Sequence, residues 1–297
     1  MSSLLKRLVL TLDMIKFEHS VFALPFALTG ALLGFREDGF ATPDPWWKLA
    51  WIIAAMIGAR SAAMTFNRIL DADIDGRNPR TSTRHLPAGL LSARFAWAFL
   101  LAASTLFLVA ARMLNPLCLY LAPVALVVVF FYSFTKRFTS MAHLVLGFAL
   151  GIAPSAAWIA VRGSYDRRML WMTAAVTLWT AGFDIIYSCQ DYEFDGREGL
   201  FSLPTRFGIN GALWIARSLH ALMIVSLAAL VLGFGLGWLA WAGVAAVVAL
   251  LLYEHRLVRA DDLSRVDAAF FTVNGYVSVL FFVFWATDIF LLRRGSL

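Results

Sequence analysis

Charged residues are scarce in this chain, and their scarcity indicates its class. Only 15% of the 297 residues are Asp, Glu, Lys or Arg, while 61% are hydrophobic. Soluble globular proteins have about 25% charged and about 45–50% apolar residues. Together with a mean hydropathy of +0.74, this composition excludes an ordinary soluble domain and indicates an integral membrane protein.

Other absences exclude particular chemistries. The two cysteines, Cys118 and Cys189, both fall inside apolar runs, so we expect buried free thiols and no disulfide framework. No Cys or His pair offers a zinc site. No glycine-rich GxxxxGK[ST] phosphate loop occurs, which argues against a nucleoside triphosphatase.

Long apolar runs fill most of the chain. A helix needs about 20 apolar residues to cross a bilayer, and nine such windows can be found. They lack the dyad alternation of a transmembrane barrel, so the predicted fold class is an all-α polytopic membrane protein with nine transmembrane helices around a central cavity. The windows cover residues 17–36, 48–70, 94–113, 115–134, 140–161, 169–189, 210–232, 236–255 and 268–292.

The net charge of +6 raises the possibility of a nucleic-acid partner, but topology explains it. If the N-terminus is cytoplasmic and the spans alternate, cytoplasmic segments hold fourteen Lys and Arg residues against eight on the opposite side. This asymmetry follows the positive-inside rule. We therefore expect no nucleic-acid partner, and we expect a location in the bacterial cytoplasmic membrane.

A short acidic motif occurs twice. DADIDGR at 71–77 aligns with DYEFDGR at 191–197. Four predicted spans separate the two copies, which places both at the same membrane face. YSFTKR at 132–137 and YEHRLVR at 253–259 form a weaker echo at nearly the same offset. One domain over 1–297 is expected, with parallel pseudo-repeats at about 17–134 and 140–255 and a ninth helix at 268–292.

The acidic residues of the two motifs have helical spacing. Asn67, Asp71 and Asp75 stand at i, i+4 and i+8, and Asp191 and Asp195 repeat the i, i+4 step, so each set lies on one helix face. Carboxylates at a helix C-terminus repel one another and the helix dipole. A solvated helix cap is the alternative explanation, but two matched sets favour a shared function.

All-oxygen ligands suit a hard divalent cation, and Mg²⁺ commonly combines one or two carboxylates with substrate phosphates. Two such clusters, facing each other, would hold Mg²⁺ ions with a diphosphate between them. Nearby cations would neutralise the phosphate oxygens, Arg doing so through two parallel hydrogen bonds. The cations expected at the diphosphate are Arg77, Arg80, Arg84, Lys136, Arg197 and Arg206.

A diphosphate at the membrane surface beside an apolar bundle implies a lipid tail in the bilayer, so a polyprenyl diphosphate is the predicted substrate. Metal would stabilise the charge of the leaving diphosphate. The allylic cation that remains must be kept from water, and aromatic faces can stabilise it. Tyr132 and Tyr187 lie at the matching depth and are expected on the acceptor side.

Charged residues inside spans are costly and indicate function by default. Arg60 precedes Asn67 by seven residues, and Asp184 precedes Asp191 by the same interval. We expect both to contact the polar group of a second substrate; the alternative is a structural salt bridge between the repeats. Glu18 and His19 enter the first span and face either the pocket or the membrane interface. Asp288 is expected at headgroup level.

The sequence resembles the UbiA-type intramembrane aromatic prenyltransferases over nearly its whole length. The resemblance is carried by NxxxDxxxD at 67–75, YxxxK at 132–136 and DxxxD at 191–195. NPRT (78–81), LPAG (86–89) and LPTRFG (203–208) also match, and GFDIIYSCQD (182–191) is similar to the bacterial 4-hydroxybenzoate polyprenyltransferase subgroup. That subgroup includes relatives assigned to menaquinone synthesis by the futalosine route. His85 stands where the family often has Pro.

The resemblance implies Mg²⁺-dependent transfer of a polyprenyl group onto an aromatic ring carbon, in a cavity open to membrane lipid. Either Arg137 or Arg60 would contact an acceptor carboxylate, and a carboxylate of the second motif would take the ring proton. By motif position, metal is assigned to Asp71, Asp75, Asp191 and Asp195, and the diphosphate to Asn67, Arg80, Lys136 and Arg197.

Alternative functions remain open at this point. A secondary transporter would also have repeats and intramembrane charges, and Pro25 and Pro154 could mark broken helices. However, transport sites lie near the midplane, whereas these acids cluster at one face. Within the family, the acceptor could be 4-hydroxybenzoate, a dihydroxynaphthoate, homogentisate or haem.

Overall fold

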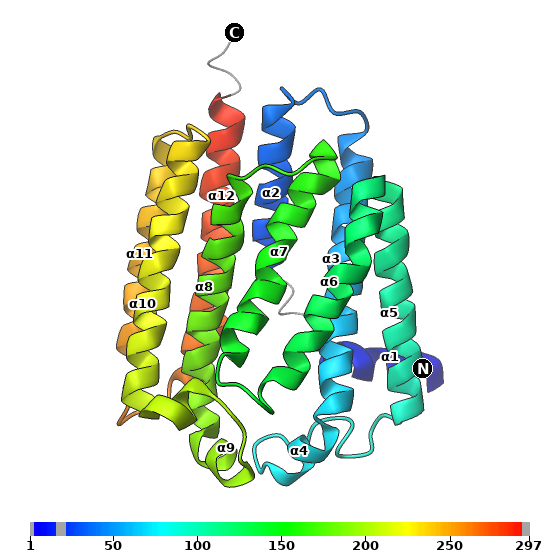
Figure 1. Cartoon of the computed structure of the whole chain (residues 1–297), viewed down its shortest axis with the longest axis vertical. Coiled ribbons are helices and arrows are strands. Elements are labelled where there is room, and N and C mark those ends of the chain that lie inside the picture. The colour runs from blue at the N-terminus through cyan, green and yellow to red at the C-terminus, as the bar shows by residue number, and fades with distance from the viewer. Residues whose placement is uncertain (1–2, 16–21, 293–297) are drawn as a thin grey trace. The chain divides into compact units, whose positions relative to one another are not determined.

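The computed structural model describes residues 3–15 and 22–292. These residues form two compact units. The first comprises the N-terminal 20 residues together with 50–134, and the second comprises 21–49 and 135–297. The described parts of both are helical and contain no β-strand, which confirms the predicted all-α class. Figure 1 shows the helices in chain order.

The first unit is built from long helices joined by a short one. In α3 and α5 the apolar windows extend to the helix ends, and Ser92 caps α5 by accepting a hydrogen bond from the Phe95 N–H, a favoured N-cap arrangement. The unit contains α1 (Ser3–Met14), most of α3 (Pro45–Leu70), α4 (Ala72–Arg77), α5 (Ala93–Leu114) and α6 (Pro116–Thr135).

The second unit holds the remaining helices. Its last helix begins after a π-helical turn, η3 (Ala268–Val273), so the predicted span at 268–292 is one continuous run with a change of helix type. The other elements are α2 (Leu24–Glu37), α7 (Ala142–Arg162), α8 (Met169–Ser188), η2 (Cys189–Asp191), α9 (Tyr192–Glu198), α10 (Leu203–Gly233), α11 (Trp238–Leu257) and α12 (Asn274–Leu292).

Eight helices among the described residues are long and apolar enough to cross a membrane. Each coincides with a predicted span. The remaining predicted span, the first at 17–36, corresponds to α2, which has 14 residues. The part of this span that contains Glu18 and His19 lies outside the described residues. The integral membrane class is therefore confirmed.

Helix α8 lies at the centre of the second unit, packed against α7 on one side and α10 on the other. Gly147 and Gly151 of α7 permit the close approach, because a Cβ at either position would overlap atoms of Thr177 on α8. Small residues four apart commonly form the contact between membrane helices, where van der Waals packing replaces the hydrophobic effect.

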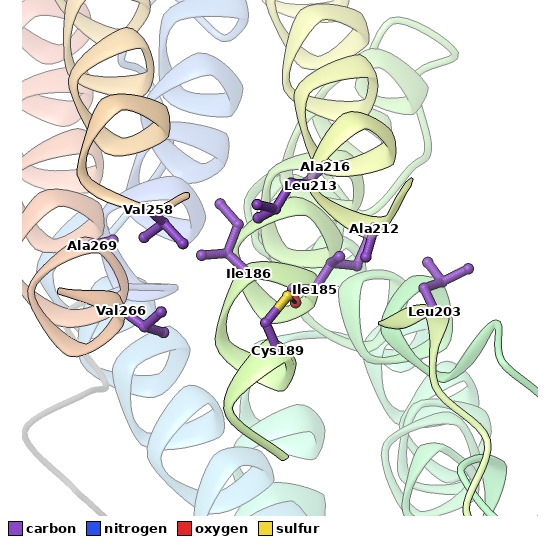
Figure 2. Close-up of a cluster of buried hydrophobic side chains, with 10 residues drawn as sticks. All are labelled: Ile185, Ile186, Cys189, Leu203, Ala212, Leu213, Ala216, Val258, Val266 and Ala269. Carbon is purple, nitrogen blue, oxygen red and sulfur yellow. Dashed lines mark hydrogen bonds between the residues drawn. The ribbon is translucent and has the colours of Figure 1, made fainter. Parts of the chain in front are cut away.

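An apolar cluster fixes the end of α8 just before the second acidic motif. Figure 2 shows Ile185 and Ile186 of α8 and Cys189 of η2 next to residues from α10 and from the segment that runs from the end of α11 into η3. All members of the cluster are buried. Close packing of this kind limits side-chain and backbone movement, so the residues that follow Cys189 begin from a rigid base.

Aromatic packing likewise holds the end of α3 in place in the first unit. The ring of Phe66 lies 4.8 Å from that of Phe130 and 5.7 Å from that of Phe134, centroid to centroid. Met14, Ile15 and Leu91 form a second buried cluster, against which Leu86 of the loop after α4 packs. Asn67 follows Phe66 directly, so this packing orients the first acidic motif.

Asp288 has a structural role that the sequence did not predict. Its side chain is 3% exposed and accepts hydrogen bonds from the backbone N–H groups of Gly237 (2.7 Å) and Ala240 (3.3 Å). These are donors at the N-terminus of α11 that have no intrahelical partner. The expected position at headgroup level stays a prediction, and the structure adds that this carboxylate on α12 caps the neighbouring helix α11.

Candidate active site

Each acidic motif begins where a long helix meets a short one. Asp71 separates α3 from α4 with φ −92° and ψ 0°, and Asp191 precedes α9 with φ −97° and ψ 6°. The two breaks thus have nearly the same backbone geometry, although they are 120 residues apart. A helix that changes direction here presents its acidic residues beyond the end of the apolar span.

The first motif has the shared face that its spacing predicts. Backbone bonds from Asp71 N to Asn67 O (2.9 Å) and from Asp75 N to Asp71 O (2.7 Å) continue through the break. Asn67 Nδ2 also donates to Asp71 Oδ2 at 3.1 Å. Asp71 and Asp75 are only 3% and 5% exposed, and burying two carboxylates so close together requires compensating positive charge.

Part of that charge comes from the protein. Arg84 donates from a terminal guanidinium nitrogen to Asp75 Oδ1 at 2.6 Å, and Arg68 lies 3.9 Å from Asp75 Oδ2. Arg84 was predicted at the diphosphate, and the structure places it on a predicted metal ligand. Arg68 was missed, although its position next to Asn67 was the available signal.

The NPRT segment folds back on α4. The Thr81 hydroxyl donates to the Asp75 carbonyl at 3.1 Å, and Asn78 Oδ1 accepts from the Arg80 N–H at 2.9 Å. Asn78 and Thr81 are buried, whereas Arg77 and Arg80 are exposed at the surface of this turn. The buried residues hold the loop, which leaves two cations facing the outside beside the acidic motif.

The second motif is more open. Asp191 and Asp195 are half-buried, and the charges of Asp191 and Lys136 both act on the Asp195 carboxylate. The Lys136 carbonyl accepts a hydrogen bond from the Phe201 N–H at 2.8 Å. The turn after α6 and the loop after α9 are therefore joined, which places the predicted lysine near the second pair of acids.

The other predicted cations of this unit differ in their surroundings. Arg197 is 79% exposed and pairs with Glu193 at 3.3 Å along α9, on a different face from Asp191 and Asp195. Arg206 donates to Ser140 Oγ at 3.3 Å. The first turn of α10 that carries it ends at Gly208, whose φ of 71° favours glycine.

Asp184 has a partner that the sequence did not indicate. His143 Nδ1 lies 2.6 Å from Asp184 Oδ2, and the backbone N–H of Leu203 donates to His143 Nε2 at 3.4 Å. His143 is 5% exposed. His143 is thus the observed side-chain partner of Asp184.

The aromatic residues expected near the acceptor lie in different environments. The Tyr187 ring is 4.2 Å from that of Phe270, and Phe183 is 5.2 Å from Phe270, centroid to centroid, so the rings of α8 and η3 form one aromatic cluster. In the first unit the Tyr132 hydroxyl contacts Met64 Sδ at 4.0 Å. Arg60 and Arg137 are half-buried.

The oxygen donors fit Mg²⁺ better than a transition metal. Among the described residues, no three His, Cys, Asp or Glu side chains converge as a metal cage. Each motif instead supplies two carboxylates, and Asp75 Oδ2 is buried without a hydrogen-bond partner in the described part of the chain. Mg²⁺ is commonly coordinated by one or two carboxylates, with water and phosphate oxygens filling its other coordination positions. Asn67, Asp71, Asp75, Asp191 and Asp195 are the residues suited to hold it.

Known proteins with similar sequences agree with this description. The model of the UbiA prenyltransferase family matches residues 23–287. A Vibrio vulnificus protein named 4-hydroxybenzoate octaprenyltransferase is 33% identical over 250 residues, covering 82% of this chain and 87% of the relative. A Cupriavidus necator protein of the same name is 34% identical, covering 76% and 79%.

Solved structures show the same fold. The apo structure of a UbiA homolog from Aeropyrum pernix K1 has a TM-score of 0.82 and 35% identity, covering 91% of this chain and 98% of that one. A UbiA homolog from Archaeoglobus fulgidus, solved with GPP and Mg²⁺, has a TM-score of 0.73 and 20% identity, covering 94% and 99%.

Proposed function

The chain belongs to the UbiA prenyltransferase family, and we propose that it transfers a polyprenyl group from a polyprenyl diphosphate to an aromatic acceptor of the 4-hydroxybenzoate type in quinone biosynthesis. The observation that carries this proposal is the repeated helix break, which presents Asp71 and Asp75 in one unit and Asp191 and Asp195 in the other. The relatives' name supports the acceptor.

We propose Mg²⁺ as the cofactor. The donor set supports it, and so does the Archaeoglobus fulgidus protein of the same fold, whose structure contains GPP and Mg²⁺. When bound, Mg²⁺ would supply positive charge that stabilises the leaving diphosphate. Asn67, Asp71, Asp75, Asp191 and Asp195 would hold the ions.

The protein's own cations would complete diphosphate binding. Lys136, Arg197 and Arg206 lie in the unit that carries the second motif, and Arg77, Arg80 and Arg84 lie in the unit that carries the first. The exposed side chains of Arg77 and Arg80 can turn toward phosphate oxygens, which Arg guanidinium groups bind bidentately. Arg84 would act through Asp75, which it contacts directly.

The reaction is an electrophilic substitution. The allylic C–O bond breaks and its electron pair leaves with the diphosphate. The allylic carbon then forms a C–C bond with the acceptor ring, and a base takes the ring proton to restore aromaticity. Asp191 or Asp195 would be that base. The rings of Tyr187 and Phe270 would exclude water from the cation, and Arg60 or Arg137 would bind an acceptor carboxylate.

The site would face the cytoplasm in the inner membrane of a bacterium. The excess of Lys and Arg on the side of the acidic motifs supports this orientation. Both substrates then approach directly, the water-soluble acceptor from the cytoplasm and the lipid diphosphate from the bilayer.

The test is product mass in detergent or membranes. Polyprenyl diphosphate is offered with 4-hydroxybenzoate, 1,4-dihydroxy-6-naphthoate or 1,4-dihydroxy-2-naphthoate, each with Mg²⁺ and with chelator. We expect a chelator-sensitive prenylated 4-hydroxybenzoate. Product on a dihydroxynaphthoate alone would reassign the pathway to menaquinone. No product with any acceptor, from folded protein, would overturn the proposal.

A further inference from the structure

A buried histidine determines the orientation of the one acidic residue that lies deep in α8. His143 stands in the first turn of α7, and Asp184 lies on the adjacent face of α8. The His143 Nδ1 to Asp184 Oδ2 distance is 2.6 Å. Neither residue belongs to the acidic motifs, and they stand 41 positions apart in the sequence.

The hydrogen bonds fix which nitrogen of His143 carries the proton. The Leu203 N–H approaches Nε2 at 3.4 Å, and a backbone N–H can only donate. Nε2 must therefore accept, so the proton is on Nδ1, where it is donated to Asp184. The Asp184 carboxylate is therefore the acceptor of the Nδ1–H bond.

The same contact completes the N-terminus of α10. The first N–H groups of a helix have no intrahelical partner, and here all are accounted for. Leu203 donates to His143, Pro204 has no N–H, Thr205 donates to Ser202 Oγ, and Arg206 donates to the Ser202 carbonyl. His143 thus links three elements: its own helix α7, Asp184 of α8 and the first turn of α10.

One carboxylate oxygen of Asp184 is not used by His143. His143 uses Oδ2, and among the described residues Oδ1 has no hydrogen-bond partner. The side chain is 23% exposed, so Oδ1 is accessible. An acidic side chain within a membrane span is costly, and such residues usually serve a substrate or ion. An accessible oxygen with a fixed direction is suited to accept a hydrogen bond from a ligand.

The position of Asp184 along α8 suits contact with the second substrate. Asp184 lies seven residues before Asp191, about 10 Å deeper along the helix axis and within about 20° of the same face. Phe183 and Tyr187, within one turn of Asp184 on the same helix, pack against Phe270. A diphosphate held at Asp191 would thus leave an aromatic ring with a polar substituent near Asp184.

We propose that Asp184 Oδ1 accepts a hydrogen bond from the ring hydroxyl of the aromatic acceptor, with His143 as the positioning residue that holds Asp184 for this contact. This inference rests on the proposed function and refines it: Asp184 selects phenols, while a separate cation binds the acceptor's carboxylate. His143 itself does not touch the substrate.

The first test uses wild-type protein and takes 4-hydroxybenzoate as the reference substrate. Its Michaelis constant is compared with the inhibition constants of 4-methoxybenzoate and benzoate, which lack the donor. A hydrogen bond to a charged group contributes about 1.5–3 kcal/mol, so we expect both analogues to bind at least about tenfold more weakly. Equal binding by benzoate, which is smaller than the substrate and cannot clash, would overturn the proposal.

The second test uses Asp184→Asn, His143→Leu and His143→Gln. Asp184→Asn should raise the acceptor KM at least about tenfold, leave the diphosphate KM within about twofold, and abolish the preference for the hydroxyl. Gln can accept from Leu203 and donate to Asp184, so His143→Gln should restore most of what His143→Leu loses. A change confined to thermal stability, or equal effects of Leu and Gln, would overturn the positioning role.

Failure here is distinguishable from failure of the proposed function. If wild-type protein yields no prenylated product, the function itself is wrong. If it does, and Asp184→Asn keeps the wild-type acceptor KM and analogue ratio, only the assignment of Asp184 is wrong. Should His143→Leu fail to fold, the analogue comparison on wild-type protein and the isosteric Asp184→Asn still decide the question.

Discussion

Arg84 and Asp75 form a 2.6 Å ion pair within the first acidic motif. A carboxylate that we assign to Mg²⁺ therefore already carries a cation from the loop that follows α4. The pair relieves repulsion between Asp71 and Asp75 before any metal arrives, and it anchors a loop whose neighbours, Arg77 and Arg80, are exposed.

Removing that cation should make folding more dependent on metal. In Arg84→Gln, the buried Asp75 carboxylate loses its closest positive partner, which costs about 1–3 kcal/mol. We expect a lower melting temperature than wild type in chelator, with a larger recovery on adding Mg²⁺. Thermal unfolding in detergent measures this, with exposed Arg94→Gln as the matched control. Equal Mg²⁺ responses in wild type and Arg84→Gln would contradict the assignment of Asp75 to metal.

Neutralising either acidic motif should abolish most turnover. Asp71→Asn and Asp191→Asn keep side-chain size but remove a ligand charge, and loss of one stabiliser of transition-state charge costs roughly 10²-fold or more in kcat. Initial rates of product formation at saturating substrates test this, with exposed Asp73→Asn as the control for a nearby charge. Near-native rates in both variants would remove the metal assignment.

Glu254 should tolerate replacement of its carboxyl group by an amide but not loss of its side chain. It is fully buried in α11; Oε1 accepts from Asn274 Nδ2 at 3.0 Å, and Oε2 has no hydrogen-bond partner among the described residues. Glu254→Gln keeps the Oε1 contact and the volume, so we expect an equal or higher melting temperature. Glu254→Ala opens a cavity and should lower stability by about 2 kcal/mol or more.

Exposed Glu193→Gln is the control for the Glu254 series. Both Gln substitutions replace a carboxyl group with an amide, but only Glu254 is buried. A large destabilisation by Glu254→Gln would show that the buried site requires the carboxyl group, contrary to this expectation.

The loop after α2 should make stability fall at low pH. Asp38 accepts a hydrogen bond from the Thr42 hydroxyl and pairs with Arg162 at 2.7 Å; the Thr42 bond first, and then the Arg162 charge, lower the pKa of Asp38 in the folded protein. A lowered folded pKa means that this stabilisation is complete above the unfolded pKa, near 3.8, and is lost as pH falls through the folded value.

The check is thermal unfolding between about pH 3 and pH 7 in wild type and Asp38→Asn, a window that spans the unfolded pKa. The variant should be less stable than wild type at neutral pH, and the difference should shrink toward the acid end of the window. A difference independent of pH would mean that Asp38 acts through packing alone.

The positions of the helices could largely be predicted from the sequence, because each span must satisfy its own backbone hydrogen bonds and bury its own apolar surface in lipid. Boundaries shifted where packing intervened. α10 begins at Leu203 instead of 210, because Ser202 caps it and a kink at Gly208 lets one extra turn form. The π-helical turn at the start of the last span had no signal, since it depends on contacts with other helices.

The sequence by itself determined the class of the protein and the shared face of Asn67, Asp71 and Asp75, since hydropathy and the 3.6-residue period are local properties. Only the tertiary structure decided which partner each acid meets: Arg84 for Asp75 and His143 for Asp184. The physical reason is that helical spacing determines which side of its own helix a side chain lies on. The partner it meets there belongs to another segment of the chain, whose position is determined by packing.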